Sequence, residues 1–379
     1  MSVDTIKFLQ KLIAKKSVTP SDDGAIALLA SQLKDLGFEV QIFELGDSQP
    51  KIKNLYAKLD RGGKNLCFAG HTDVVPEGYG WRHDPFAAAI EDDILYGRGA
   101  VDMKGAIACF IGAVSEFLEQ NQNVNTPFSL SFLVTGDEEG TAKFGTKALL
   151  EQISDKIDYC IVGEPTSEES IADAIKIGRR GSINGELVVG GVQGHVAYPE
   201  SAHNPIHDLV NILNALKNYE FTDSSNHFPA STFAVTSVDV GNAATNVIPG
   251  SAKATFNIRT SNLTNVGDIR NWIEQSISKY AKTFDLNLNV SGESFLSKPV
   301  ELLDAVNLAV EEHVGKLPDI TSKGGTSDAR FIKDYCDQIV ELGLKNGTAH
   351  KVDECVSIND LALLQKIYYS IIYNTFIKA

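Results

Sequence analysis

The sequence lacks long hydrophobic runs and paired cysteines. None of its apolar stretches reaches the roughly 18 residues of a membrane-spanning helix, so we expect no transmembrane segment. The N-terminal segment has apolar residues at helical spacing but no hydrophobic core followed by a cleavage site, which argues against a signal peptide. The five cysteines form no CxxC pair, and Cys67, Cys109 and Cys160 lie within apolar runs. This usage indicates reduced, mostly buried thiols and a cytoplasmic protein.

The sequence also has fewer basic than acidic residues. Lys and Arg number 34 against 49 Asp and Glu, which gives a net charge of −15 that is spread along the chain. We therefore expect no binding to nucleic acid or to an anionic membrane surface. A hydrophobic content of 43% and a charged content of 22% are typical of a soluble globular protein.

The order of the expected strands and helices indicates two kinds of domain. At 379 residues the chain is too long for one ordinary core. Over 1–179, and again over 295–379, apolar strands alternate with helices, which predicts a layered α/β domain with a mostly parallel sheet. Over 180–294 the order strand–helix–strand–strand–helix–strand predicts an α+β domain of the ferredoxin-like type. We thus expect one discontinuous catalytic domain with a second domain inserted in it.

Several side chains of metal-ligand type stand where expected strands end or in adjacent glycine-rich turns. They are His71, Asp102, Glu138, Glu139, Glu164 and His350. Each alone has an ordinary explanation, such as a helix N-cap for Asp102 or a solvated acidic loop for Glu138 and Glu139. In α/β sheets, however, ligands bind beyond the carboxyl ends of the strands. Two imidazoles and four carboxylates that converge there need a cation, so the set predicts a hydrolytic site with two metal ions.

Two further residues are candidates for supporting roles. Asp73 follows His71 by two positions, where its carboxylate could hold the second ring N–H of the histidine and fix its tautomer. His195 lies in the glycine-rich segment GGVQGHVAYPE, which is no phosphate-binding loop because GxxxxGK[ST] is absent. Its place in a turn outside the metal-binding domain makes it a candidate donor to an oxyanion.

Cations gather where the two expected domains meet. Lys176, Arg179 and Arg180 lie close together in the sequence, and Arg259 ends a strand of the inserted domain. In an acidic protein such a cluster often neutralises internal carboxylates, but it could equally hold an anionic substrate through bidentate contacts. The segment 324–328 precedes an expected helix, so its backbone N–H groups could also receive a carboxylate.

Taken together, the segments HTDVVP, GRGAVDMKG, TGDEEG, VGEPT and GTAHKVDE resemble those of the co-catalytic zinc amidohydrolases and peptidases. That family includes acetylornithine deacetylase, aminoacylase and carboxypeptidases, and the resemblance spans essentially the whole chain. It implies two Zn²⁺ ions per chain, with Co²⁺ as an alternative in the second position. Asp102 would bridge the ions, His71 and Glu164 would complete one position, and Glu139 and His350 the other.

The resemblance also implies roles outside the metal ligands. Glu138 matches the general acid/base, and the peptide bond after Asp102 is expected to be cis. His195 and Asn246 match residues that reach the partner's active site in a homodimer, so residues 180–294 would form a lid and dimerisation domain. The chain departs from the usual pattern after HTDVVP, where it continues as EGYGWRHDPF. The residues that match binders of substrate carboxylates are Lys176, Arg179, Arg259, Gly325 and Thr326.

Three segments narrow the resemblance to one branch of the family. KIGRRGSINGELVVGGVQGHVAYPE, NVIPG and KGGTSDARF are similar to those of desuccinylases that convert N-succinyl-LL-2,6-diaminopimelate to succinate and LL-2,6-diaminopimelate in lysine biosynthesis. Two alternatives are another N-acyl amino acid deacylase, such as acetylornithine deacetylase, and a non-catalytic metal-dependent binding protein. The cations favour the succinylated substrate, which carries three carboxylates where acetylornithine carries one. Glu138 beside Glu139 argues against a pure binding protein, which needs only the metal ligand.

Overall fold

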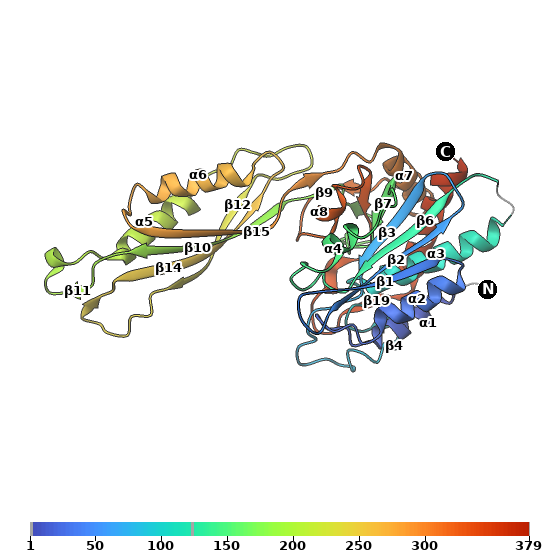
Figure 1. Ribbon diagram of the computed structural model, residues 1–379, viewed down its shortest axis with the longest axis horizontal. Coiled ribbons are helices and arrows are strands. Elements are labelled where there is room, and N and C mark those ends of the chain that lie inside the picture. The colour runs from blue at the N-terminus through green and yellow to red at the C-terminus, as the bar shows by residue number, and fades with distance from the viewer. Residues whose placement is uncertain (1–2, 123–124, 379) are drawn as a thin grey trace. The chain divides into compact units, whose positions relative to one another are not determined.

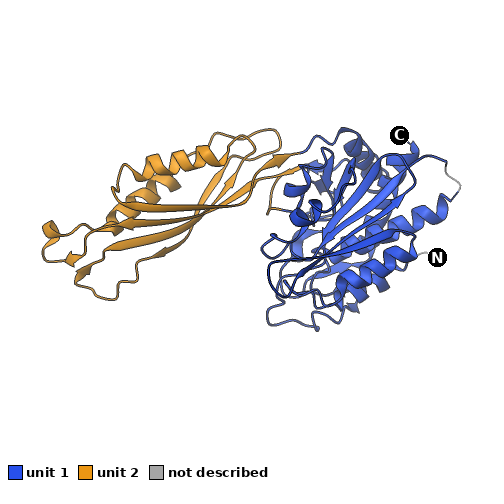
Figure 2. Cartoon of the chain, viewed as in Figure 1, with its two compact units in different colours: residues 1–177, 297–321, 327–379 blue, residues 178–296, 322–326 orange. Residues whose placement is uncertain are grey.

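The computed structural model describes residues 3–122 and 125–378 and divides the chain into two compact units (Figure 2). Unit 1 comprises residues 1–177, 297–321 and 327–379 apart from those outside the described ranges, and unit 2 comprises 178–296 and 322–326. In the described part of the chain no helix is long and apolar enough to cross a membrane. All five cysteines are unpaired, and only Cys355 is partly exposed.

Unit 1 is built on a six-stranded sheet with the order β1–β2–β6–β3–β7–β18. The pairs β1–β2 and β2–β6 are antiparallel, whereas β6–β3, β3–β7 and β7–β18 are parallel. The sheet is therefore mixed, with three parallel and two antiparallel pairs, because β2 runs against the other strands. A short connection between β1 and β2 allows only antiparallel pairing, because parallel neighbours need a long crossover. The strands are β1 (Glu39–Leu45), β2 (Ile52–Asp60), β3 (Asn65–His71), β6 (Ser129–Thr135), β7 (Tyr159–Val162) and β18 (Ile339–Glu341).

Helices cover this sheet, and α3 (Lys104–Gln120) is the most deeply buried of those described (Figure 1). It packs against α1 (Thr5–Ile13) and α9 (Ile358–Tyr373), and α9 also packs against α7 (Val300–Val314). Gly112 permits this close packing, since a Cβ there would lie 2.2 Å from Oγ1 of Thr5. The remaining helical elements of unit 1 are α2 (Ala25–Asp35), α4 (Thr146–Leu150), α8 (Ala329–Ile332), η2 (Asn346–Thr348) and η3 (Asn374–Lys378).

Short strands fasten the loops of unit 1 to one another. One three-stranded sheet joins β19 (Cys355–Ser357) to β5 (Ile94–Tyr96) and β5 to β4 (Ala89–Glu91). A two-stranded parallel pair joins β8 (Ala174–Ile175) to β17 (Asp319–Ile320). The first of these sheets fixes the C-terminal part of the chain beside the turn that follows β5.

Unit 2 contains a four-stranded antiparallel sheet with the order β12–β14–β10–β15. Helices α5 (Pro205–Lys217) and α6 (Val266–Ile277) pack on one face of it, over a core that includes Leu187, Ile212 and Ile273 (Figure 1). This is the strand and helix order expected from the sequence. The other elements are β9 (Gly178–Arg179), β10 (Gly181–Gly190), β11 (Gly194–His195), η1 (Pro199–Ser201), β12 (Thr232–Asp239), β13 (Val247–Ile248), β14 (Ser251–Thr260), β15 (Phe284–Gly292) and β16 (Phe295–Leu296).

Candidate metal centre

Three adjacent parallel strands deliver most of the candidate ligands to one edge of the unit 1 sheet. His71 is the last residue of β3, Glu138 and Glu139 follow β6, and Glu164 follows β7. The strands are fully buried, so their registers are fixed by packing on both faces. The structure therefore brings these side chains together at the carboxyl edge of the sheet.

Asp102 lies between two imidazoles that come from opposite ends of the chain. Its Oδ1 is 3.2 Å from Nε2 of His71, and its Oδ2 is 3.2 Å from Nε2 of His350. Nε2 of His71 is also 3.8 Å from Oε1 of Glu164, and Nε2 of His350 is 2.7 Å from Oε1 of Glu139. The side chains thus form two neighbouring groups that share the Asp102 carboxylate, and the Asp102–Met103 peptide bond is cis, as the resemblance implies.

Asp73 supports the site in a different way from the one expected. Nδ1 of His71 is 2.9 Å from the backbone carbonyl oxygen of Asp73, whereas the nearest carboxylate oxygen of Asp73 is 3.7 Å away. The carboxylate instead accepts hydrogen bonds from the backbone N–H groups of Glu138 and Glu139, at 3.2 and 3.0 Å, and from Oγ1 of Thr19 at 2.6 Å. Asp73 therefore orients the turn that carries the two glutamates. The backbone carbonyl fixes the tautomer of His71, since a carbonyl only accepts and leaves Nε2 of a neutral ring facing the carboxylates.

The charges of the cluster compensate one another only in part. Burial lowers the pKa of His71, but the hydrogen bond to Asp102 and the charges of Glu138 and Asp73 outweigh it and raise that pKa. Hydrogen bonds to Asp102 and Glu139 raise the pKa of His350 to about 10. Burial and the nearby Glu164 carboxylate raise the pKa of Glu138 well above its ordinary value. In the absence of metal, protons on these side chains therefore offset the negative charge of the cluster. A divalent cation bound there would offset the same charge.

The donor set fits divalent cations. The ligand atoms of His71, Asp102 and Glu139 lie within 4.8 Å of one another, and so do those of His71, Glu138 and Glu164. Imidazole nitrogen and carboxylate oxygen are ligands that suit Zn²⁺, Co²⁺ and Mn²⁺. Both groups contain His71, and His350 lies beside Asp102 and Glu139, so the residues that surround the Asp102 carboxylate fit a pair of ions.

Two buried residues beside the cluster carried no assignment from the sequence. Glu354, the last residue of the segment GTAHKVDE, is fully buried and accepts a hydrogen bond from the backbone N–H of Asp102. Lys104, which follows the cis peptide bond, is fully buried as well and donates to the carbonyl oxygen of Lys15 at 2.8 Å. Burial lowers the pKa of Lys104 to about 7. The only feature that could have singled out Glu354 and Lys104 is that each carries a charge and is buried. Burial cannot be read from the sequence before the fold is known, so neither residue was predicted.

His195 and Asn246 lie side by side in unit 2. The short strands β11 and β13 pair, and the backbone N–H of Val196 donates to the carbonyl oxygen of Asn246 at 3.1 Å. Nδ1 of His195 accepts the backbone N–H of Ala197 at 3.1 Å. In the neutral ring the proton is therefore on Nε2, which leaves an exposed N–H donor, as an oxyanion donor requires.

The structure places the candidate substrate-binding cations in both units. Lys176 is buried in unit 1, and Arg179 is buried in unit 2, where its Nη1 donates to the carbonyl oxygen of Gly325 at 3.0 Å. Arg259 is partly buried on β14, and burial lowers its pKa. Burial and the charge of Arg259 also lower the pKa of Arg180. A bound anion would reduce the repulsion between the guanidinium groups of Arg180 and Arg259. Thr326 is partly buried, next to the exposed Gly325.

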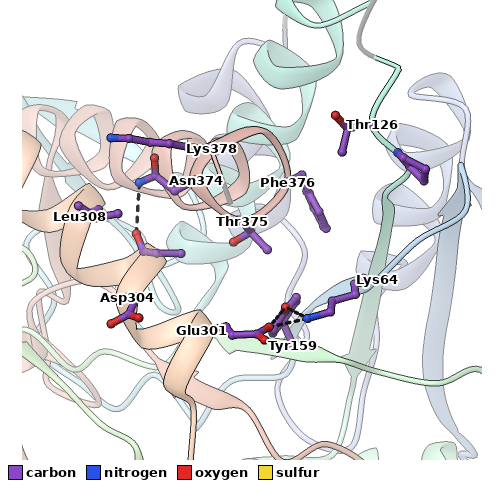
Figure 3. A pocket seen from close by; sticks show the side chains of 12 residues that line it. Lys64, Thr126, Tyr159, Glu301, Asp304, Leu308, Asn374, Thr375, Phe376 and Lys378 are labelled. Atoms are coloured by element: carbon purple, nitrogen blue, oxygen red, sulfur yellow. Dashed lines mark hydrogen bonds and ion pairs between the residues drawn. The ribbon is translucent and has the colours of Figure 1, made fainter.

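A cavity of about 520 Å³ at the other end of the unit 1 sheet does not belong to this site. Lys64 donates to Oε2 of Glu301 at 2.5 Å and to the hydroxyl of Tyr159 at 2.6 Å at its wall (Figure 3). Lys64 precedes β3, whereas His71 ends it, so about 20 Å of extended chain separates them. None of the described residues that line the cavity is a histidine, and the candidate metal ligands lie at the opposite edge of the sheet.

Comparison with known proteins agrees with this geometry. Residues 67–374 match the model of peptidase family M20/M25/M40, and the chain belongs to that family. It is 47% identical to succinyl-diaminopimelate desuccinylase of Ehrlichia chaffeensis over 99% of both chains, and 47% identical to that of Gluconobacter oxydans over 96% of both. Among solved structures, an M20 metallo-carboxypeptidase from Sulfolobus solfataricus shares the fold with a TM-score of 0.77 at 18% identity, covering 97% of this chain and 98% of the other. A Bacillus subtilis protein described as a dinuclear metal binding peptidase from the M20 family has a TM-score of 0.71 at 16% identity, covering 97% and 96%.

Proposed function

We propose that this protein is a metal-dependent amidohydrolase that converts N-succinyl-LL-2,6-diaminopimelate to succinate and LL-2,6-diaminopimelate, in lysine and diaminopimelate biosynthesis. The observation that carries the proposal is the Asp102 carboxylate between the imidazoles of His71 and His350. Glu138 lies beside it, and the curated relatives carry the name of this desuccinylase. The free cysteines support a cytoplasmic location.

Two divalent cations would occupy the site. We assign Zn²⁺ to both positions, with Co²⁺ as an alternative in the second. His71, Asp102 and Glu164 would hold one ion, and Asp102, Glu139 and His350 the other. When bound, such a pair polarises the amide carbonyl and lowers the pKa of the attacking water toward about 7.

Glu138 would carry the proton between water and the leaving group. Its backbone N–H is held by Asp73, and burial beside Glu164 raises the pKa of its carboxyl group. Carboxyl groups serve as general acid–base catalysts in many enzymes. Glu138 takes a proton from water as the oxygen attacks the amide carbon. It then gives the proton to the nitrogen as the carbon–nitrogen bond breaks, so that succinate and a free amine leave.

Unit 2 would serve as lid and dimerisation domain. We propose that His195 and Asn246 act in the active site of the partner in a homodimer, where Nε2–H of His195 donates to the oxyanion. The hydrogen bond from the N–H of Ala197 to Nδ1 supports this role, since it leaves Nε2 as the donor of a neutral ring. The edge strand β12 supports dimerisation, since Val235 and Val238 are exposed on it and its outer backbone groups are available for pairing.

The cations would select a substrate with several carboxylates. We assign carboxylate binding to Lys176, Arg179 and Arg259, with the backbone at Gly325 and Thr326. Guanidinium groups recognise carboxylates with two parallel hydrogen bonds, which a substrate with three carboxylates can use more fully than one with a single carboxylate.

Succinate release by the metal-loaded protein tests the proposal. We expect a kcat/KM for N-succinyl-LL-2,6-diaminopimelate that exceeds the value for acetylornithine by orders of magnitude. A preference for acetylornithine would indicate another deacylase, and a lack of hydrolysis of either amide by protein with two bound ions would indicate a binding protein.

A further inference from the structure

The Glu354 carboxylate lies in a fully buried position and accepts hydrogen bonds with both oxygens. Oε2 accepts from Nη1 of Arg98 at 2.7 Å and from the backbone N–H of Gly99 at 3.0 Å. Oε1 accepts from the backbone N–H groups of Val101 at 2.9 Å and Asp102 at 3.1 Å. One side chain therefore holds the whole turn that ends at Asp102.

Arg98 extends this contact to the chain that follows β3. Its side chain is buried, and its Nη2 donates to the carbonyl oxygen of Glu77 at 3.1 Å. The guanidinium group also lies 5.1 Å from the ring centre of Trp81. Arg98 and Glu354 thus form a buried ion pair at 2.7 Å, in which the loss of one partner would leave the other charge buried and uncompensated.

Glu354 also belongs to the segment that carries His350. It directly precedes β19, whose first residue, Cys355, pairs with Tyr96 of β5. The backbone carbonyl oxygen of Glu354 accepts the N–H of Gly97 at 2.9 Å. The segment 350–354 and the turn 97–102 are thus joined by the backbone and by the Glu354 carboxylate, and each segment carries one of the two residues whose side chains meet at 3.2 Å.

We infer that Glu354 is a positioning residue that sets the spacing between the Asp102 carboxylate and the His350 imidazole, and thereby the affinity of the site for its metal ions. The inference rests on the proposed function in that it takes these residues as metal ligands. Glu354 itself contacts neither ligand side chain. Its effect passes through the backbone N–H of Asp102, because a shift of that backbone moves the carboxylate that both metal positions share.

Glu354→Gln is the direct test. An amide offers one acceptor oxygen where the carboxylate offers two, so two of the four donors lose their partner. We expect Zn²⁺ and Co²⁺ titrations of metal-free protein to show an affinity lowered roughly 10- to 100-fold, the usual effect of losing a group that orients metal ligands. We expect kcat to fall with KM little changed, because Glu354 is not assigned to the substrate.

Glu354→Asp keeps the charge opposite Arg98 and so protects folding if the glutamine variant is unstable. Its shorter side chain cannot reach both Arg98 and the N–H groups of Val101 and Asp102, so metal affinity should still fall. Tyr368→Phe is the matched stability control, since it removes a buried hydrogen bond, 2.5 Å to the carbonyl oxygen of Leu342, away from this turn. It should lower the melting temperature without lowering metal affinity.

Two outcomes overturn the inference. One is metal affinity and kcat at the wild-type level in Glu354→Asp. The other is a loss of metal affinity in Tyr368→Phe as large as in the Glu354 variants, which would trace the effect to general destabilisation. Calorimetric titration needs no substrate, so the positioning role can fail while the wild-type enzyme still releases succinate. It can equally hold if the wild-type enzyme prefers a different amide.

Discussion

Nε2 of His350 lies 2.7 Å from Oε1 of Glu139, although 211 residues separate them in the chain. The contact joins the turn after β6 to the segment before β19, and all of unit 2 lies between them in the sequence. One of the two proposed metal positions can therefore form only after both parts of unit 1 have folded together.

Glu138 and Glu139 should separate catalysis from metal binding. We expect Glu138→Gln to bind both ions as the wild-type protein does and to lose roughly 10²- to 10⁴-fold in kcat, the usual contribution of a general acid–base group. The neighbouring Glu139→Gln is the matched control and should lose metal affinity as well. Metal content and succinate release measure the two effects. Full activity of Glu138→Gln would contradict its assignment.

Subunit mixing should reveal whether His195 acts across a dimer. His195→Ala alone should lower kcat roughly 10²- to 10³-fold, as the loss of an oxyanion donor does, without loss of metal. When His195→Ala and Glu138→Gln chains are unfolded and refolded together, a mixed dimer contains one site with an intact Glu138 and a partner's intact His195. Activity should then return toward about a quarter of the wild-type level, since random assembly makes half the dimers mixed and one site of each is complete. If His195 serves its own chain, mixing restores nothing.

Arg259 should determine affinity for the succinylated substrate. We expect Arg259→Gln to lower kcat/KM for it roughly 10- to 100-fold, mainly through KM, because a hydrogen bond between charged groups is worth about 1.5–3 kcal/mol. The same variant should change hydrolysis of an acetylated monocarboxylate much less. An equal loss with both substrates would assign Arg259 to the structure of unit 2 instead.

Chelation of the metal ions should destabilise unit 1. The metal-free site brings carboxylates together, and a ligand that binds only the folded state at 100 times its Kd stabilises that state by about 2.7 kcal/mol. We therefore expect a chelator to lower the melting temperature and added Zn²⁺ to restore it. Hydrogen exchange should locate the loss of protection in the turns at 97–102 and 137–139. A melting temperature that does not respond to chelation would argue against the metal site.

Asp223 should make unit 2 sensitive to acid. Burial raises its pKa, but hydrogen bonds from Ser231 and Thr264 outweigh burial and hold the pKa below its ordinary value of 3.8. Because the folded-state pKa is the lower one, the stabilisation is complete well above pH 3.8 and is lost as the pH falls through the folded-state pKa.

Asp223→Asn keeps the shape of the side chain and removes this dependence. At pH 7 we expect the variant to be less stable by about 1 kcal/mol, a modest figure because the site is partly exposed to solvent. The difference from the wild type should shrink below about pH 4. Urea titrations of hydrogen exchange in unit 2 measure it, and a difference that does not change with pH would contradict the explanation.

The order of helices and strands could be predicted from the sequence, but the direction of each strand in the sheet could not. The order of strands and helices in unit 2 was predicted, because alternating and periodic segments separated by turn residues have few alternative interpretations. The reversed direction of β2 was not predicted, because β2 is buried along most of its length and such an apolar run looks the same in either direction.

By itself the sequence indicated which side chains are of metal-ligand type and that strands β3, β6 and β7 carry four of them at or just after their ends, since both follow from local segments of the chain. Only the tertiary structure decided how they are held. The carboxylate of Asp73 serves the backbone of Glu138, 65 residues away, and Glu354 serves that of Asp102, 252 residues away. Such partners are chosen by the packing of distant segments, because a buried carboxylate accepts from whichever N–H groups the fold brings to it.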